Sequence, residues 1–432
     1  MLQPNHRNGF HSLQILGTIA SSSALTLAAI TTAVGGTSST PPAQISLSTS
    51  PKAVLDEAWQ IVDRDYVDPQ FNRVDWKQVR QSLLSRSYPN NQAAYAALKD
   101  ALKKLNDPYT RFLDPKEFQA LNNEAIDGEL IGVGLQLQQD PQTKALTVVK
   151  ALDQSPAAKA GLKPGDKLLA IDGKQTQGMS IESATRLIRG SVNTPVKLLL
   201  SRTQKAPFTV TVVRQKIELP VVYSALRQQN NQRIGYIRLS EFSGHAAEQM
   251  RQAITNLSRQ NVDRFVLDLR GNPGGRLDQE TAIARMWLNN GAIVRIVDRN
   301  GNTEQITANN TALTNKPLAV LVDGGSASAA EILTGALKDN NRAVVIGTQT
   351  FGKALVQSVN PLSDGSGINV TIARYFTPNG TDINQRGITP NVVSPLTEAQ
   401  AKDLSQHPDK LGTAQDPQFQ RALSQIKAAL TR

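Results

Sequence analysis

The chain has 432 residues, enough for two or three domains, and its 39% apolar and 19% charged residues are ordinary for a globular protein. It contains no cysteine, which excludes disulfides, a thiol nucleophile and a cysteine-ligated metal. The formal net charge is +11, but no dense Lys/Arg block with interleaved aromatics and no zinc pattern is present. A nucleic-acid partner is therefore not expected. We expect instead a dispersed basic surface that aids peripheral association with an anionic membrane.

Residues 1–50 have the features of a targeting segment and linker. Arg7 precedes a mostly apolar run from Leu13 to Val34, and Ala33-Val34-Gly35 supplies the small residues that a signal peptidase accepts. The run is also just long enough to span a bilayer, so an uncleaved membrane anchor is the alternative. In both cases the remainder of the chain is expected to be exported.

Residues 51–126 predict a helical N-terminal region. Val54, Leu55, Ala58, Trp59 and Val62 follow a helical spacing, and the pattern returns from Ala94 to Leu105. We expect these helices to pack together and assign them no chemistry.

Residues 127–218 change to a β-rich texture. Glycines punctuate the stretch from Leu130 to Leu137, Asp172-Gly173 is typical of a hairpin turn, and Ser180–Arg189 has a helical pattern. The segment resembles a PDZ domain over its whole length. That resemblance implies binding of a peptide as an extra strand, with the free C-terminal carboxylate held by a backbone loop. The residues matching this loop are Ile131, Gly132, Val133, Gly134 and Leu135. The plainer interpretation is a small β-rich domain that binds nothing.

Residues 219–395 alternate between predicted strands and helices, which indicates an α/β core. The predicted strands are Ile234–Leu239, Phe265–Leu269, Leu318–Val322, Ala343–Ile346 and Ile368–Ala373. Leu318–Val322 is continuously apolar, as expected of a strand buried on both faces. Residues 396–432 form a polar tail with one amphipathic helix and no assigned chemistry.

One nucleophile candidate follows the Leu318–Val322 strand. Gly324-Gly325 breaks the strand, and Ser328 stands where a helical pattern begins, so that free backbone N–H groups lie beside it. Such a position suits a serine whose attack creates an oxyanion. Ser328 and Glu331 also have the spacing of a capping box, which requires no catalysis. The two interpretations are compatible, because Glu331 can brace the helix start in a supporting role.

The candidate base is a lysine. Two of the four histidines lie in the leader and one in the tail, and His245 has the setting of a surface residue. A pair of Ser328 with Lys353 is then the economical arrangement, provided that burial by Phe351, Leu355 and Val356 keeps the amine neutral. Gln357, four residues beyond, offers a neutral amide that orients an amine without stabilising its charged form.

These residues carry a second resemblance. Gly325-Ser-Ala-Ser-Ala-Ala-Glu331, followed by Thr350-Phe-Gly-Lys-Ala-Leu-Val-Gln357, resembles the carboxy-terminal processing proteases, the Ser–Lys endopeptidases of the tail-specific class. The spacing of 25 residues between Ser328 and Lys353 and the glutamate at +3 both agree with that family. Ala330 and Ala354 depart from it, at positions where serine and glycine are common. The resemblance further implies that the N–H groups of Gly274 and Ala329 form the oxyanion hole.

The sequence therefore predicts an α+β multidomain protein with a helical N-terminal region, an inserted PDZ domain and a crotonase-like (ClpP/crotonase-type) protease core. The expected function is an exported serine endopeptidase, located in a periplasm or thylakoid lumen, that acts on proteins or peptides with free C-termini. The catalytic group is Ser328, Lys353 and Gln357, and no metal or cofactor is expected. Two alternatives are a non-catalytic PDZ adaptor on a protease-like core and an enzyme of acyl-CoA chemistry.

Overall fold

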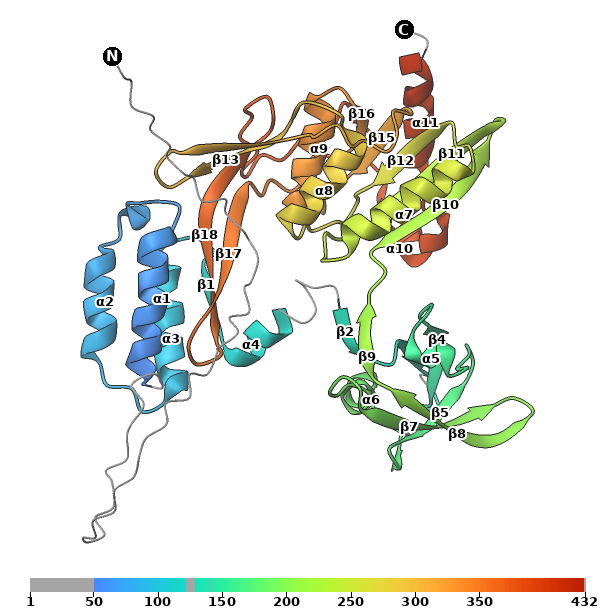
Figure 1. Ribbon diagram of the computed structural model, residues 1–432, viewed down its shortest axis with the longest axis horizontal. Helices are drawn as coiled ribbons and strands as arrows, with labels where there is room; N and C mark the ends of the chain where they lie inside the picture. Colours follow the sequence, from blue (N-terminus) through green and yellow to red (C-terminus); the bar gives the residue numbers. More distant parts are fainter. Residues whose placement is uncertain (1–49, 122–128, 141, 431–432) are drawn as a thin grey trace, which may run out of the picture. The chain divides into compact units, whose positions relative to one another are not determined.

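The computed structural model describes residues 50–121, 129–140 and 142–430 (Figure 1). The predicted targeting segment lies outside the described residues, apart from Ser50 at its end. Within the described ranges, no helix combines the length and apolar character needed to cross a membrane. The chain divides into two units, which are taken separately below.

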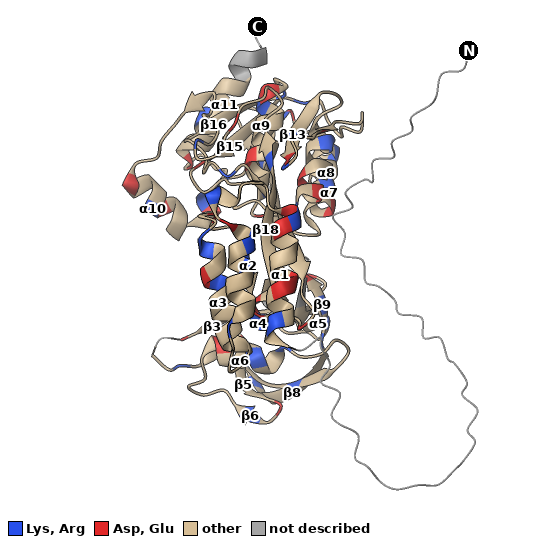
Figure 2. Ribbon diagram, turned by 90° about the vertical axis from the view of Figure 1, so that its left-hand side faces the viewer, with Lys and Arg blue, Asp and Glu red and all other residues tan. Residues whose placement is uncertain are grey.

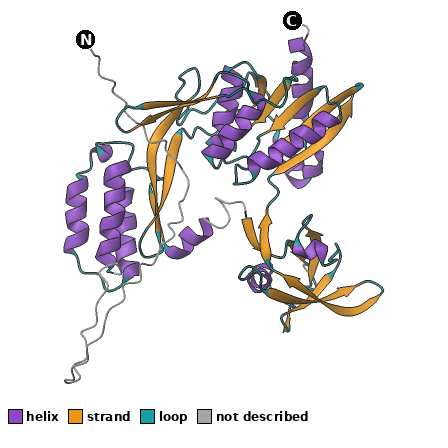
Figure 3. Ribbon diagram, in the orientation of Figure 1, coloured by secondary structure: helices purple, strands orange, loops and turns teal. Residues whose placement is uncertain are grey.

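The smaller unit combines Met1–Phe112 with Gln357–Thr371. Its described part contains three α-helices, one short 3₁₀ helix and most of a hairpin (Figure 3). The helices bury the side chains that the helical spacing predicts, and Trp59 Nε1 donates to the backbone oxygen of Trp76 at 2.7 Å. The elements are α1 (Pro51–Asp65), the short η2 (Phe71–Arg73), α2 (Trp76–Ser85), α3 (Asn91–Lys103), β1 (Arg111–Leu113), β17 (Leu355–Pro361) and β18 (Gly367–Phe376).

The hairpin of β17 and β18 is attached to these helices by polar contacts. Tyr95 donates its hydroxyl to Asp364 at 2.5 Å, and Ser363 donates its N–H and hydroxyl to Glu57 at 3.0 and 2.7 Å. Residues 357–371 thus group with the N-terminal helices, although their sequence lies within the predicted protease core. This grouping does not test the domain boundaries expected from the sequence, which stay predictions.

A β-rich domain begins after helix α4 (Pro115–Ala120) and has its own core. Leu146, Leu168, Leu198 and Leu200 are almost fully buried in it, and the ion pair of Arg202 with Asp166 (2.6 Å) closes one edge. The helix predicted at Ser180–Arg189 is present as α6, with Ser180 as its N-cap, and the predicted turn at Asp172-Gly173 joins β5 to β6. The elements are β2 (Glu129–Gly132), β3 (Leu135–Gln139), β4 (Leu146–Ala151), α5 (Pro156–Lys159), β5 (Lys167–Ile171), β6 (Lys174–Gln175), α6 (Ile181–Ile188), β7 (Pro195–Arg202), β8 (Lys205–Val213) and β9 (Gln215–Glu218).

The α/β core is built on one six-stranded sheet of order β10-β11-β12-β15-β16-β19. β10 and β11 are antiparallel, and the remaining neighbours are parallel. All five residues of β12 and of β15 are buried, which confirms the prediction that Leu318–Val322 is covered on both faces. The strands are β10 (Val222–Gln229), β11 (Gln232–Leu239), β12 (Arg264–Asp268), β15 (Leu318–Val322), β16 (Ala343–Gly347) and β19 (Val392–Val393).

Helices cover both faces of this sheet (Figure 1). On one face, Val320 and Val322 pack with α7 (Ala246–Arg259), α8 (Leu277–Trp287) and α9 (Ala329–Asp339). On the other, Ala319 and Leu321 pack with Phe419, Ala422, Leu423 and Ile426 of α11 (Pro417–Leu430). The helix predicted in the polar tail is therefore a structural layer of the core. The other elements of this unit are β13 (Ala292–Asp298), β14 (Thr303–Thr307), α10 (Glu398–Gln406) and η4 (Pro408–Lys410).

Charged residues are scattered along the ribbon. Figure 2 shows Lys and Arg interspersed with Asp and Glu over the drawn face, without one continuous basic block. This distribution agrees with the dispersed charge predicted from the sequence.

Candidate active site

The turn after β15 is fixed by a neighbouring loop before it reaches Ser328. Asp323 Oδ1 accepts N–H bonds from Gly325 (2.9 Å) and from Gly271 (2.8 Å), and the Ser326 hydroxyl donates to the backbone oxygen of Leu269 (2.8 Å). A Cβ at Gly325 would lie 2.9 Å from Gly271 Cα, so only glycine allows this approach. The loops that follow β12 and β15 are therefore held against each other.

Ser328 has an unusual backbone conformation at the start of α9. Its φ is 54° and its ψ is −117°, a region that non-glycine residues rarely occupy. The N–H groups of Glu331 and Ile332 donate to its backbone oxygen at 2.8 and 3.0 Å. A sharp strand-to-helix turn with a strained serine is typical of a nucleophile site.

Glu331 explains how this strained turn is maintained. Its carboxylate is fully buried and accepts four hydrogen bonds. Oε2 accepts the N–H of Ser328 (3.0 Å) and of Lys353 (2.8 Å), and Oε1 accepts the N–H of Gly352 (2.7 Å) and the hydroxyl of Thr350 (2.5 Å). The predicted supporting residue thus connects the Ser328 turn to the Lys353 loop as well as bracing the helix.

Tyr375 provides a second connection between the same two segments. It is buried on β18, and its hydroxyl contacts the backbone oxygen of Ser328 (3.2 Å) and that of Lys353. Neither Tyr375 nor Thr350 carries a signal of this role in the sequence, because both contacts depend on strand neighbours rather than on local spacing.

Lys353 lies half-buried in the loop between β16 and β17. Ala354 beside it is fully buried, and Leu355 and Val356 are half-buried. The expectation that Phe351 helps to bury the lysine is wrong, because its side chain is 57% exposed. The Phe351 N–H donates to the backbone oxygen of Ser326 at 3.0 Å, and the neighbouring residues Thr350 and Gly352 both donate to Glu331. With its backbone held in this way, the ring of Phe351 points outward.

Gly274 lies directly beside the serine. A Cβ on Gly274, whose φ is +97°, would approach within 2.7 Å of the Ala327 oxygen, 2.8 Å of Ser328 Cβ and 2.9 Å of the Ala329 nitrogen. The two N–H groups that the family resemblance singled out therefore come from adjacent backbones. Ala329 is the first residue of α9, where helical N–H groups have no intrahelical partner.

The side chain of Asn272 is hydrogen-bonded to the N–H of Gly274. This fully buried side chain accepts that N–H at 2.8 Å and donates to the backbone oxygen of Leu239 at 3.0 Å. It thereby orients the Gly274 peptide, a role that the glycine-rich pattern alone did not indicate.

Gln357 is the third residue of β17 and is half-buried. It opens the hairpin segment that groups with the N-terminal helices rather than with Ser328 and Lys353. Its predicted role of orienting the amine stays a prediction.

The predicted carboxylate loop lies at the entry to the β-rich domain. Ile131 and Gly132 end β2, Val133 and Gly134 connect it to β3, and Leu135 begins β3. The carbonyl groups of Val133 and Gly134 accept bonds from within the domain, from Ala157 (2.8 Å) and Leu152 (2.9 Å). A Cβ at Gly134, with φ +77°, would lie 2.3 Å from Ser155 Cβ, so this turn requires glycine.

Comparison with known proteins agrees with this arrangement. Residues 233–394 match peptidase family S41, and residues 147–202 match a PDZ domain. The chain is 43% identical over 354 residues to the carboxyl-terminal-processing protease of Synechocystis sp., covering 82% of each protein. It is 32% identical to the carboxy-terminal processing protease CtpA of Bacillus subtilis, over 77% of this chain and 70% of that one.

A solved structure extends the similarity to the whole fold. The photosystem II D1 C-terminal processing protease superimposes with a TM-score of 0.55 at 35% identity, over 86% of this chain and 100% of that one. The fold and the family match are those of a serine-type peptidase. More particularly, the chain belongs to the carboxyl-terminal-processing proteases of peptidase family S41. The predicted family, fold class and enzyme class are thus confirmed.

Proposed function

We propose that this processing protease is an exported endopeptidase that uses Ser328 and Lys353 to form an acyl-enzyme. The observation that carries the proposal is the single carboxylate oxygen, Glu331 Oε2, that accepts the N–H groups of both residues. A buried shared acceptor holds the nucleophile and its base in one rigid frame, as general-base catalysis requires.

The chemistry needs no group beyond these residues and water. Neutral Lys353 takes the proton of the Ser328 hydroxyl while Oγ attacks the peptide carbonyl carbon. The tetrahedral oxyanion accepts hydrogen bonds from Gly274 and Ala329 N–H, taking the place of Asn272 as acceptor at Gly274. The lysine then gives its proton to the leaving amine as the C–N bond breaks. Water, deprotonated by the lysine, hydrolyses the ester and releases the new C-terminus. Gln357 orients the amine in this scheme.

Labelling of the nucleophile tests the mechanism. A fluorophosphonate probe should modify Ser328 in the wild-type protein, located by peptide mass spectrometry, and should label neither Ser328→Ala nor heat-denatured enzyme. Modification of a different serine, or full peptidase activity in Ser328→Ala, would remove the proposal. An adaptor that merely binds C-termini would retain its binding in Ser328→Ala and show no turnover in the wild type.

Substrate selection is proposed to lie in the PDZ domain. The loop Ile131–Leu135 would receive a free C-terminal carboxylate, with the peptide added along β3. The glycine at position 134 supports this proposal, because its close approach to Ser155 fixes the conformation of the loop that would present the N–H groups.

The proposed location is a periplasm or thylakoid lumen, with the N-terminal segment as signal or anchor. The support is that relatives come from cyanobacteria and chloroplasts, among them an Arabidopsis thaliana chloroplastic peptidase that is 40% identical. One solved relative is named for photosystem II D1, so a C-terminal extension on a lumenal membrane-protein segment is the substrate class to test first. Mass spectrometry of protein C-termini in cells with and without the enzyme would reveal the substrates; unchanged C-termini would contradict a processing role.

A further inference from the structure

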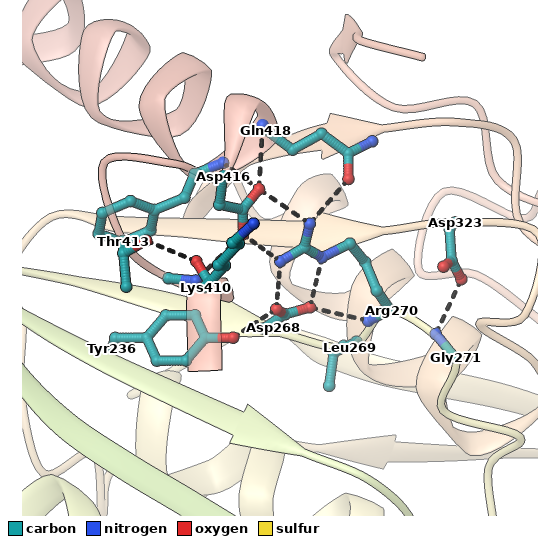
Figure 4. Close-up of polar contacts among 12 residues, drawn as sticks. Tyr236, Asp268, Leu269, Arg270, Gly271, Asp323, Lys410, Thr413, Asp416 and Gln418 are labelled. Carbon is teal, nitrogen blue, oxygen red and sulfur yellow. Dashed lines mark hydrogen bonds and ion pairs between the residues drawn. The ribbon is translucent and has the colours of Figure 1, made fainter. Parts of the chain in front are cut away.

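The loop that carries Gly274 begins at a cluster of buried charges. Asp268 ends β12, and Arg270 follows two residues later. Arg270 faces Asp416 and Gln418, which come from the C-terminal segment (Figure 4). Asp268 and Asp416 are fully buried, and Arg270 is 7% exposed.

Arg270 uses every donor of its guanidinium in this cluster. Nε and Nη2 donate to the two oxygens of Asp268 at 2.9 and 2.5 Å. Nη2 and Nη1 donate to the two oxygens of Asp416 at 2.6 and 3.1 Å, and Nη1 also donates to Gln418 Oε1 at 2.9 Å. Two forked bonds on adjacent edges, which share Nη2, fix the plane of the guanidinium, a geometry that lysine does not reproduce.

The remaining lone pairs of the carboxylates are also satisfied. Tyr236 donates its hydroxyl to Asp268 at 2.6 Å, and the N–H groups of Gly412, Gln418 and Phe419 donate to Asp416 at 3.1, 3.2 and 3.2 Å. Burial alone would raise the pKa of Asp268, but the charge and hydrogen bonds of Arg270 outweigh it and lower that pKa. The positive charge of Arg270 therefore favours the ionised form of Asp268.

Such a cluster is weak evidence for stability. Removing charges from water is costly, and well-packed apolar side chains of the same volume often serve the fold equally well. Its place in the chain indicates a different use. Arg270 lies four residues before Gly274, and the intervening Gly271 N–H is bound to Asp323, which stands in the turn that leads to Ser328.

We propose that Asp416, together with Gln418, is a positioning residue of the peptidase site. By holding Arg270 on the guanidinium edge next to the one that Asp268 binds, the C-terminal segment sets the direction in which the loop leaves β12, and so places the Gly274 peptide against Ser328. This inference rests on the proposed function, in which Gly274 N–H binds the oxyanion. The C-terminal segment, to which the sequence assigned no chemistry, then completes the catalytic loop.

The test compares Asp416→Asn, immediately before α11, with a variant that weakens the packing of α11 itself. Asp416→Asn keeps the shape and the acceptor oxygen and removes the charge that faces Arg270. The control is Ile426→Val, a buried side chain of α11 that packs on the sheet and makes none of the contacts of Arg270. Both variants are assayed on a peptide substrate at temperatures at which each is fully folded by near-UV circular dichroism.

A positioning role predicts a loss in kcat. For Asp416→Asn we expect kcat to fall about 10-fold or more with KM within about twofold, since only transition-state binding is impaired. Affinity for a peptidyl boronate, whose tetrahedral adduct places an oxygen in the oxyanion site, should fall by a similar factor. Ile426→Val should retain kcat and boronate affinity. Equal kcat values for the two variants would overturn the proposal and leave a purely structural cluster.

A second variant covers the case in which Asp416→Asn does not fold. Gln418→Met removes one acceptor of Arg270 at nearly constant volume, and we expect kcat to fall about threefold; an unchanged kcat contradicts the proposal. Fluorophosphonate labelling of the wild type distinguishes a failure of the proposed function from a failure of the positioning role. If Ser328 is not labelled, the proposed function fails; if Ser328 is labelled and the variants match the control, only the positioning role fails.

Discussion

The backbone N–H groups of Ser328 and Lys353 donate to the same oxygen, Glu331 Oε2, at 3.0 and 2.8 Å. The two residues are 25 positions apart and belong to different turns of the α/β core. Because the shared acceptor is fully buried, neither turn can shift without exposing or breaking a charge-assisted hydrogen bond.

Replacing the base should abolish turnover while preserving the fold. Lys353→Arg keeps the positive charge and cannot give up its proton, so kcat should fall about 10³-fold or more, as in Ser328→Ala. Wild-type activity should rise with pH as the amine becomes neutral. Single-turnover cleavage of a peptide with an apolar C-terminus measures this, with near-UV circular dichroism to establish folding. Near-normal turnover in folded Lys353→Arg would make the lysine an electrostatic group and direct the search for a base to Glu331 or His245.

Glu331→Gln should damage both stability and activity. The amide offers one oxygen for four donors, and its NH₂ group would face N–H groups of the backbone. We expect a loss of about 2–4 kcal/mol in the free energy of unfolding and a kcat reduced at least 10-fold. Thr350→Val is the comparison, since it removes one of the four donors together with the acceptor of the Ile388 N–H and should cost about 1–2 kcal/mol. Urea unfolding distinguishes them; similar losses in both variants would contradict a central role for the carboxylate.

Gly274→Ala should inactivate the enzyme without unfolding the sheet. The new Cβ would lie 2.7–2.9 Å from atoms of residues 327–329 at a φ of +97°, so the peptide must move away from Ser328. We expect kcat to fall about 100-fold, the usual effect of losing one oxyanion donor. Gly301→Ala is a suitable comparison, because it also has positive φ but nothing within 4 Å of the added Cβ. Retained kcat in Gly274→Ala would argue against an oxyanion role.

Glu280→Gln should change the pH dependence of stability. Glu280 is fully buried on α8, and among the described residues its Oε1 has no hydrogen-bond partner. Burial raises the pKa of this carboxyl well above its ordinary value. Its contribution to stability is therefore complete below the unfolded-state pKa, about 4.3, and is lost as pH rises toward the folded pKa, because only the unfolded chain then ionises it.

The variant cannot ionise, so it should be more stable than the wild type at pH 8, by on the order of 1 kcal/mol. The difference should shrink towards pH 4. Thermal unfolding at several pH values measures this, with Glu304→Gln on exposed β14 as the control. Parallel stability curves for Glu280→Gln and the wild type would show that the buried carboxyl does not control this dependence.

Amidating the C-terminus of a substrate peptide should slow its cleavage if the PDZ loop binds a free carboxylate. We expect kcat/KM to fall about 10-fold through KM, since a charge-assisted contact to backbone N–H groups is removed. Gly134→Ala, which forces the loop away from Ser155, should abolish the preference. Equal cleavage of free and amidated peptides by the wild-type enzyme would remove the recognition proposal.

Much of this architecture follows from local sequence patterns. The apolar run Leu318–Val322 predicts its strand residue for residue, and the helical spacing after Ser328 predicts α9. The pair of motifs ending in Glu331 and Lys353 predicted the family, because their spacing is a property of the chain alone. Strand propensity, helix periodicity and motif spacing each depend on residues within about twenty-five positions of one another along the chain. They can therefore be recognised in a single sequence.

Tertiary structure decided which of those residues meet. Local spacing presents Glu331 as a helix cap, and only the parallel pairing of β15 with β16 brings the Lys353 loop to its carboxylate. Tyr375 contacts Ser328 from 47 residues away, and Asp416 contacts Arg270 from 146 residues away. Phe351, apolar and next to buried positions, points outward because the Thr350 hydroxyl and the Gly352 N–H on either side of it are bound to Glu331. Such contacts depend on the order of strands in the sheet and on turn geometry. Strand order and turn geometry produce no periodic pattern in the sequence of the residues that make the contacts.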